Sequence, residues 1–379
     1  MSQCFRILFI TSNLRGGGAE RALVNILNHL DRAHFEPHLA LYQEEGVFLR
    51  DLASDVPVYE IQPQDLSFLQ RNWVRIRAVK RVCEQIQPAL VMSVLWQANI
   101  VTLLSDAVLG LGCPVLTNEQ NPPAEKLAHI WQRHVYWPLA RLAYQRAARV
   151  VTISAGIASQ FRRLLSVAEH KLVIIPNPIS LQDIRTQSAQ QRPRDIRTHP
   201  RLIAVGSMKK QKNYPLLLRA FSRLTQEESA HLYILGDGPE RSRLEELIDA
   251  LDLAPLVRLV GFRENPFVYL RQADLFVLSS DYEGFGNVLV EAMALGVPVV
   301  STDCPYGPRE ILVDGEYGVL VPPRDADALA AAILSLLRQP SRRRKLAAAG
   351  QKRAADFAIE AIVPQYEKLF RDLIENTRE

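Results

Sequence analysis

Cysteine is scarce in this sequence, and the cysteines it has are far apart. Cys4, Cys83, Cys113 and Cys304 form no Cys-x-x-Cys pair and no cluster with histidine. Such spacing argues against a disulfide framework and against a structural zinc site. We therefore expect reduced, buried thiols, no metal ion and no cofactor. The sequence also shows no Ser/His/Asp or Cys/His arrangement typical of a catalytic nucleophile.

Long hydrophobic runs are missing as well. A helix that crosses a bilayer needs roughly 20 apolar residues. The best candidate, residues 94–116, is interrupted by Gln97, Asn99 and Asp106. The apolar run at residues 5–10 is too short for the core of a signal peptide. We therefore expect a cytoplasmic protein.

Acidic residues are absent from one long stretch. No Asp or Glu occurs from Lys126 through Ala168, although the whole chain carries a net charge of only +4. We expect one face of the N-terminal part to be cationic. The basic residues of this stretch are Lys126, Arg133, Arg141, Arg146, Arg149, Arg162 and Arg163.

The hydrophobic pattern predicts two α/β domains. Short apolar runs alternate with helical patterns, which favours parallel sheets covered on both faces. The first group of strands is expected at 6–11, 37–42, 89–94, 114–118, 149–153 and 172–176, and the second at 201–205, 231–235, 256–260, 274–278, 297–301 and 318–321.

A polar stretch separates the two groups of strands. We predict an N-terminal domain over 1–181, a linker over 182–200 and a C-terminal domain over 201–355. The tail over 356–379 is expected to contain a helix from about residue 364. Its apolar side is formed by Ile362, Tyr366, Leu369, Phe370 and Leu373.

The stretch 283–300 has the pattern of a ligand site. The turn Gly284-Phe285-Gly286-Asn287 lets the backbone approach a ligand closely, and the predicted helix 288–295 points its N-terminal amides at that position. A diphosphate suits such a site. Glu291 stands in an apolar helical run, so it either reaches solvent or accepts hydrogen bonds from hydroxyls such as those of a ribose.

Two further loops each follow the first predicted strand of a domain. Gly16, Gly17 and Gly18 lie between a strand and a helix, a phosphate-binding layout without the G-x-G-x-x-G spacing of dinucleotide enzymes. The loop 206–213 carries Lys209, Lys210 and Lys212, which are either solvated or close to a leaving phosphate.

Glu283 and Glu291, with seven residues between them, and the following Gly296-Val297-Pro298-Val299-Val300 resemble the nucleotide-sugar signature of glycosyltransferase family 4. This family has the GT-B fold, in which two Rossmann-like domains face each other across a cleft. The resemblance implies that the N-terminal domain binds the acceptor, that the C-terminal domain binds the nucleotide-sugar, and that the C-terminal helix returns to the first domain. The resemblance implies a retaining enzyme that works without a metal, by front-face attack assisted by the leaving phosphate. Glu283 would orient the sugar, and Lys212 would hold the phosphate.

The resemblance also assigns the remaining site residues. In addition to catalytic Glu283 and Lys212, it implies donor binding, a donor-phosphate or acceptor loop, and an acceptor side. The donor-binding residues are Glu291, Gly284, Phe285, Gly286, Asn287, Lys209, Arg263, Arg309 and Glu310. The donor-phosphate or acceptor loop is Gly16, Gly17 and Gly18, and the acceptor-side residues are Glu119 and Gln120.

The sequence departs from the family pattern at two positions. Ser207 follows the glycine of the loop after residue 205, where family members commonly have arginine. Gln120 stands in the region where many members place a histidine near the donor sugar, so no catalytic histidine is expected. Two alternatives follow from this departure: Lys209 or Lys210 replaces the missing arginine, or the site is weakened.

The glycine loop at 16–18 and the segments 287–291 and 307–310 resemble members that extend undecaprenyl-diphosphate-linked glycans. We expect transfer of a hexose or N-acetylhexosamine from a nucleotide-sugar, with UDP favoured, to a lipid-linked or polysaccharide acceptor. The alternatives are a nucleotide-sugar 2-epimerase of the same fold and a non-catalytic nucleotide-sugar-binding subunit.

Basic and aromatic residues suggest a peripheral contact with an anionic membrane. The stretch 73–82 interleaves basic and apolar residues, and Trp131, Tyr136, Trp137, Leu142 and Tyr144 lie in the acid-free stretch. The other interpretation is that these helices bury their apolar side chains in the core. No nucleic-acid recognition motif is present, so no nucleic-acid partner is expected.

Overall fold

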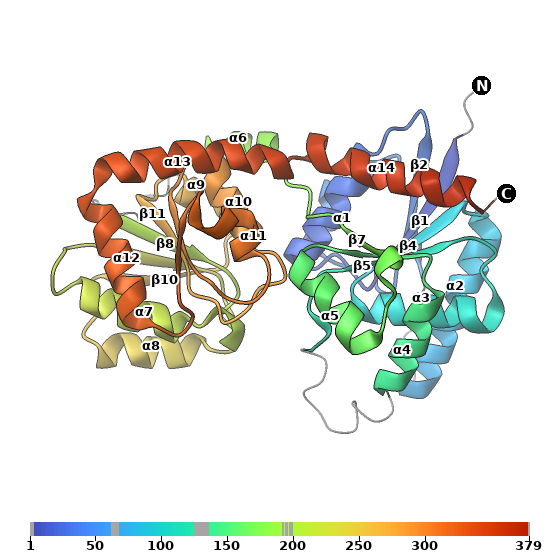
Figure 1. The fold of residues 1–379 in the computed structure, drawn as a ribbon, viewed down its shortest axis with the longest axis horizontal. Helices are drawn as coiled ribbons and strands as arrows, with labels where there is room; N and C mark the ends of the chain where they lie inside the picture. Colours follow the sequence, from blue (N-terminus) through green and yellow to red (C-terminus); the bar gives the residue numbers. More distant parts are fainter. Residues whose placement is uncertain are drawn as a thin grey trace. The chain divides into compact units, whose positions relative to one another are not determined.

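The computed structural model describes residues 4–61, 68–124, 136–191, 193, 196 and 200–377. The chain forms two compact units, Met1–Pro178 together with Ile359–Glu379, and Ile179–Ala358. In each unit, helices flank a parallel sheet (Figure 1). We call these the first and the second unit.

The first unit contains a parallel sheet of order β3-β2-β1-β4-β5-β6-β7. Its inner strand β1 is buried from Ile7 to Thr11, as expected for a strand covered on both faces. The strands are β1 (Phe5–Thr11), β2 (Phe35–Leu41), β3 (Val58–Glu60), β4 (Leu90–Val94), β5 (Val115–Glu119), β6 (Arg149–Thr152) and β7 (Leu172–Ile174).

Helices from both ends of the chain cover this sheet. The C-terminal helix packs Phe370 against Phe9 and Phe35, with ring centroids 6.1 and 6.0 Å apart. The helices are α1 (Gly18–His29), η1 (Val47–Asp51), α2 (Phe68–Ile86), α3 (Trp96–Leu109), α4 (Trp137–Arg146), α5 (Ala155–Leu165), η4 (Glu169–Lys171) and α14 (Ile359–Glu375).

The second unit repeats the strand order of the first, as β10-β9-β8-β11-β12-β13. All its strand pairs are parallel. The strands are β8 (Arg201–Val205), β9 (His231–Leu235), β10 (Val257–Gly261), β11 (Leu275–Leu278), β12 (Val299–Thr302) and β13 (Val319–Val321).

The helices of the second unit include one inside the expected linker. Helix α6 belongs to this unit, where Asn265 donates a hydrogen bond to the carbonyl of Gln187 at 2.9 Å. The helices are α6 (Leu181–Ser188), η5 (Lys210–Lys212), α7 (Tyr214–Leu224), α8 (Arg241–Ala250), α9 (Phe267–Leu270), α10 (Asn287–Ala294), α11 (Pro308–Leu312), η6 (Val313–Gly315), α12 (Ala326–Arg338), α13 (Pro340–Ala354) and η7 (Ala355–Phe357).

The structure differs from the sequence predictions at several places. Strand β3 was not predicted, and α14 begins at Ile359 rather than near residue 364, with Pro364 inside it. All four cysteines are free, but only Cys83 and Cys304 are buried. Among the described helices, none has both the length and the apolar character needed to cross a bilayer.

Candidate functional site

The strand order of the second unit places two loops next to a natural ligand position. The order reverses between β8 and β11, so the chain leaves these neighbouring strands toward different sides of the sheet. In open parallel sheets, ligands bind beyond the carboxyl ends of the strands at this switch point. Lys212 follows β8, and Glu283 follows β11. The topology therefore brings together two residues that the sequence separates.

Lys212 and Glu283 form an ion pair that is largely shielded from water. Lys212 Nζ donates to Glu283 Oε1 at 2.6 Å, and the side chains are only 14% and 7% exposed. Ser280 Oγ donates to the same carboxylate oxygen, also at 2.6 Å. An ammonium group has three donors, so this pair fixes the Lys212 head group while leaving it further donors for a ligand.

Backbone and side-chain hydrogen bonds hold the two loops against each other. The Asp281 amide donates to the Gln211 carbonyl at 2.8 Å, and Gln211 Nε2 donates to the Tyr282 carbonyl at 3.0 Å. Asn213 Nδ2 donates to Asp281 Oδ1 at 3.0 Å. The Lys212–Glu283 pair therefore belongs to a pre-organised junction.

Helix α10 begins beside this junction at a glycine that needs its conformational freedom. Gly286, the residue before α10, has φ +103°, which residues with a Cβ rarely adopt. The amides of the first turn of a helix lack intrahelical acceptors, so they can bind an anion. Phe285 is buried and packs edge-to-face on Phe357, with centroids 5.3 Å apart.

A third loop, after β12, also reaches the glycine turn. At Gly307, which has φ +74°, an added Cβ would lie 1.8 Å from the carbonyl oxygen of Phe285. The amide of Glu283 donates to the carbonyl of Pro305 at 3.2 Å. Loops from the adjacent strands β8, β11 and β12 therefore meet at one place.

Other predicted donor residues lie on α10, in the turn before it, and on the loops after β8 and β10. Asn287 and Glu291 lie one helical turn apart on α10 and are half-buried, while Gly284 is buried in the turn before it. Lys209 is exposed on the loop after β8. Arg263 is exposed on the loop after β10 and donates to Tyr269 Oη at 3.4 Å.

Two predicted donor residues lie on α11. Arg309 is exposed, and its guanidinium is paired with Asp303 and Asp314. Glu310 is half-buried, and its backbone carbonyl accepts a hydrogen bond from Arg353. Contact of Arg309 and Glu310 with the donor sugar stays a prediction.

The sequence contains one Asp-x-Asp pattern, Asp325-Ala326-Asp327, although we expected no Asp-x-Asp metal motif of the kind that other glycosyltransferases use. Asp325 caps α12 by accepting from the amide of Ala328 at 2.9 Å, and Asp327 pairs with Arg223 at 2.9 Å. Both carboxylates therefore have structural partners. In the part of the chain that the structure describes, no group of three or more His, Cys, Asp or Glu side chains is placed to hold a metal.

In the first unit, the glycine loop also lies at a switch point. The strand order reverses between β1 and β4, and Gly16 and Gly17 connect β1 to α1, which begins at Gly18. Gly16 has φ +128°. At Gly17, an added Cβ would lie 2.3 Å from a Glu20 carboxylate oxygen. A larger residue at position 17 would therefore displace Glu20 from the start of α1.

Glu119 has a structural setting that we did not predict. Its carboxylate is 1% exposed and accepts hydrogen bonds from Tyr144 Oη and, at 2.6 Å, from Asn99 Nδ2. Burial, with the Glu119 charge beside it, raises the pKa of Tyr144 well above its ordinary value, so Tyr144 stays a donor. This geometry gives Glu119 partners in the core of the first unit, and its acceptor-side role stays a prediction.

Gln120 belongs to a chain of buried amides. It exchanges hydrogen bonds of 2.9 Å with Asn177 and donates to Asn118 Oδ1 at 2.6 Å. Asn118 in turn donates to Tyr366 Oη of α14 at 2.8 Å. The network links the end of β5 to the C-terminal helix, and Gln120 is 6% exposed.

The predicted membrane surface is divided by the structure. Tyr144 is fully buried, which corrects its assignment to that surface, whereas Leu139 and Leu142 on α4 are 40% and 68% exposed. Trp73 on α2 is exposed and lies under the guanidinium of Arg77. Lys126, Trp131 and Arg133 lie outside the described residues.

Two residues of the junction escaped the sequence analysis. Ser280 and Asp281 stand just before Glu283, and their position directly after a predicted strand was the available signal. Cys304 lies near the same pair, and burial raises the pKa of its thiol to about 12, which keeps it protonated and unreactive.

Known proteins resemble this chain in both units. The family model described as Glycosyltransferase Family 4 matches residues 16–183, and the model described as Glycosyl transferases group 1 matches residues 186–353. The Campylobacter jejuni protein named N-acetylgalactosamine-N,N'-diacetylbacillosaminyl-diphospho-undecaprenol 4-alpha-N-acetylgalactosaminyltransferase is 30% identical over 325 residues, 83% of this chain and 85% of that protein.

Two further proteins extend the comparison. The lipopolysaccharide core biosynthesis glycosyltransferase LpsD of Rhizobium meliloti is 28% identical over 363 residues, 93% of this chain and 95% of that protein. The crystal structure of Anabaena HepE in complex with UDP has a TM-score of 0.79 at 21% identity, covering 97% of this chain and 100% of that one. At this identity the likeness concerns the fold, and it confirms the predicted GT-B class.

Proposed function

This chain belongs to glycosyltransferase family 4, and from that premise we propose a retaining, metal-independent enzyme that transfers a hexose or N-acetylhexosamine from a UDP-sugar. The acceptor is a lipid-linked or polysaccharide glycan of cell-surface synthesis. The observation that carries the proposal is the shielded Lys212–Glu283 pair at the switch point of the second unit, beside the start of α10.

The proposed chemistry follows from the charges at this junction. When the bond between the sugar and the diphosphate breaks, negative charge develops on the leaving phosphate. The remaining donors of Lys212 and the amides at the start of α10 stabilise that charge, because both are fixed before the reaction. Glu283 holds the ammonium in place through its 2.6 Å hydrogen bond and orients the sugar.

The remaining donor contacts are assigned by position. Glu291 lies one turn into α10, where its carboxylate accepts hydrogen bonds from the ribose hydroxyls. Arg309 and Glu310, from the loop after β12, are proposed to contact the sugar. The glycine loop at 16–18 takes the donor phosphate or the acceptor.

The acceptor proposal is supported by two relatives, which are named as a diphospho-undecaprenol glycosyltransferase and a lipopolysaccharide core glycosyltransferase. Exposed Leu139 and Leu142 on α4, with Arg141 between them, suit a shallow contact with an anionic membrane, where such acceptors lie. Flotation with phosphatidylglycerol vesicles tests this contact. Replacing both leucines by glutamine should reduce flotation, whereas Phe262→Gln, at an exposed apolar residue of the second unit, should not.

Calorimetric titration with UDP, GDP and ADP tests the donor site. We expect UDP to bind the native protein and to bind Glu291→Ala at least about tenfold more weakly, because two hydrogen bonds to a charged acceptor are lost. Glu246→Ala, exposed on α8, is the matched control. Equal affinity of the two variants for UDP would remove Glu291 from the site. In a separate assay, conversion of a UDP-sugar in the absence of an acceptor would favour a 2-epimerase.

A further inference from the structure

Helix α11 is too short to hold its own position. It has five residues, Pro308–Leu312, whereas isolated helices need about 12–15 residues even for marginal stability. The last carbonyls of any helix have no intrahelical donor. The position of α11, and of the proposed sugar contacts Arg309 and Glu310 on it, therefore depends on groups from other elements.

Gly307 fixes the first end of α11. Its backbone lies so close to the Phe285 carbonyl that no side chain fits between them. This contact joins the start of α11 to the glycine turn before α10. The other end of α11 needs a different support, because Val313 and Asp314 follow it with φ of +45° and +52°.

Arg353, on α13, supplies that support. Its Nε donates to the Ile311 carbonyl at 3.1 Å and its Nη2 to the Glu310 carbonyl at 3.0 Å, so one guanidinium satisfies two terminal carbonyls of α11. Asp356 holds the third nitrogen, Nη1, at 2.8 Å. The planar fork of arginine is suited to such multiple donation, which a lysine ammonium cannot reproduce in the same geometry.

Aromatic rings complete the setting of Arg353. The guanidinium carbon lies 4.7 Å from the centroid of Phe357 and 5.8 Å from that of Tyr317. Phe357 also packs on Phe285 of the glycine turn. Arg353 therefore touches both the end of α11 and the ring that supports the turn before α10.

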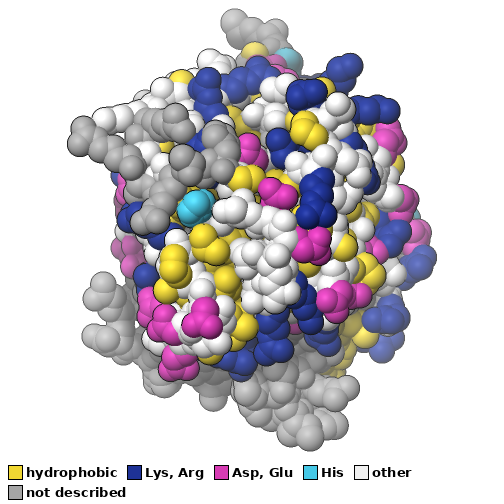
Figure 2. All heavy atoms as spheres, turned by 90° about the vertical axis from the view of Figure 1, so that its left-hand side faces the viewer, with side chains coloured by type: hydrophobic (Ala, Val, Ile, Leu, Met, Phe, Trp, Pro, Cys, Tyr) yellow, Lys and Arg dark blue, Asp and Glu magenta, His cyan; other side chains and the backbone are white. Residues whose placement is uncertain are grey.

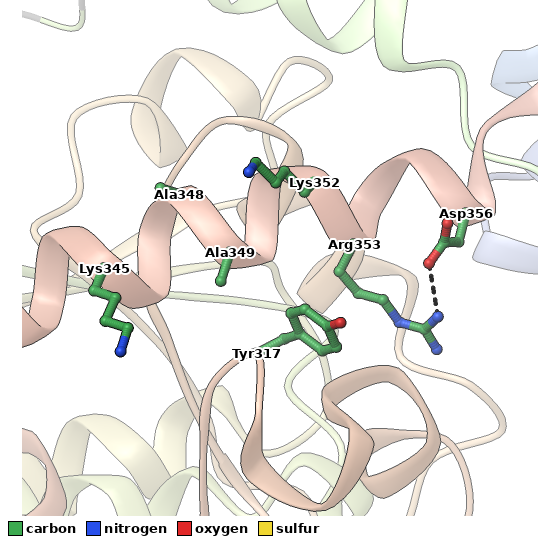
Figure 3. A pocket seen from close by; sticks show the side chains of 7 residues that line it. All are labelled: Tyr317, Lys345, Ala348, Ala349, Lys352, Arg353 and Asp356. Atoms are coloured by element: carbon green, nitrogen blue, oxygen red, sulfur yellow. Dashed lines mark hydrogen bonds and ion pairs between the residues drawn. The ribbon is translucent and has the colours of Figure 1, made fainter.

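Other basic residues of α13 differ from Arg353. The helix carries Arg342, Arg343, Arg344, Lys345 and Lys352 as well, and basic side chains gather along the upper edge of the face shown in Figure 2. Lys345 and Lys352 are exposed. With Tyr317 and Arg353 they line a pocket of about 490 Å³, where Arg353 is the residue joined to Asp356 (Figure 3).

We propose that Arg353 is a positioning residue for the donor sugar: it holds α11 so that Arg309 and Glu310 meet the sugar of the nucleotide-sugar. This inference rests on the function proposed above. Arg353 touches the backbone of α11 and does not act on the reacting atoms. Its loss should therefore affect recognition of the sugar more than recognition of the nucleotide, which is assigned to α10 and Lys212.

The test compares two ligands, UDP and UDP-N-acetylglucosamine, by calorimetry. In Arg353→Met, we expect affinity for the nucleotide-sugar to fall about tenfold while affinity for UDP changes less than about twofold, because hydrogen bonds from a charged donor to two carbonyls are lost. Arg353→Lys, which keeps the charge and should fold if the methionine variant does not, should show an intermediate ratio. Lys352→Met, at the exposed neighbour, is the matched control and should leave both affinities unchanged.

The outcomes separate the two proposals. A role of Arg353 in stability alone would lower the melting temperature without changing the ratio of the two affinities, and an unchanged ratio in both Arg353 variants would overturn the inference. Failure of the native protein to bind either ligand would instead overturn the UDP-sugar donor proposed above, and the role of Arg353 with it.

Discussion

Replacing Lys212 by methionine should destabilise the second unit as well as abolish turnover. Methionine keeps much of the volume of the side chain but removes the ammonium that pairs with Glu283. The Glu283 carboxylate then stays 7% exposed and keeps the hydrogen bond from Ser280. An uncompensated buried charge is expensive, so the free energy of unfolding should fall.

The size of the effect follows from the burial of the pair. Removing one partner of a buried ion pair costs about 3–5 kcal/mol, and the 14% exposure of Lys212 together with the bond from Ser280 favours the lower end. For a unit of this size, 1 kcal/mol shifts the melting temperature by about 2–4 °C, so we expect a decrease of about 6–12 °C. The double variant Lys212→Met, Glu283→Gln removes both charges and should recover most of this loss, while remaining inactive.

The chain offers an internal control for the measurement. Its four tryptophans, Trp73, Trp96, Trp131 and Trp137, all precede residue 179 in the sequence, so tryptophan fluorescence reports on the unfolding of the first unit. Far-UV circular dichroism follows both units. The Lys212 variant should shift the dichroism transition in urea more than the fluorescence transition. Wild-type stability of the single variant, or a double variant as unstable as the single one, would refute the reasoning.

Three further predictions concern other parts of the molecule. Gly307→Ala should weaken UDP binding in calorimetry and destabilise the protein more than Gly315→Ala. Both glycines have positive φ, but only at Gly307 would the added Cβ lie against another backbone segment. Equal effects of the two substitutions would contradict this. Tyr144→Phe should cost about 1–3 kcal/mol in urea denaturation followed by fluorescence, because buried Glu119 loses a donor, and Glu119→Gln in the same background should lessen the cost. Burial lowers the pKa of His38, so the unfolded state binds a proton at this residue more readily than the folded state does. The first unit should therefore lose stability as the pH falls below about 6.5. A His38→Gln variant with the same dependence of stability on pH would exclude this residue as the cause.

Local sequence patterns were sufficient for most of the secondary structure. The predicted runs at 201–205 and 231–235 coincide with β8 and β9, because a strand buried on both faces reads as a continuous apolar run. Strand β3 has three residues that are not fully buried at the edge of the sheet, so its hydrophobic signal was too weak to detect. Helix α6 lies largely inside the predicted linker, and it was not predicted because its sequence is mostly polar. Asn265 of the same unit contacts this helix.

The two α/β domains and the glycine turn before α10 could be predicted from sequence, since both depend on residues that are neighbours along the chain. Which side chains meet could not be predicted in this way, because it depends on the tertiary fold. Lys212 and Glu283 are 71 positions apart in the sequence. Glu119 accepts hydrogen bonds from Asn99 and Tyr144, which lie on other elements. The order of strands in a sheet, rather than any local pattern, brings such residues together. Their burial then makes each charge depend on its partner, because water is not available to solvate it.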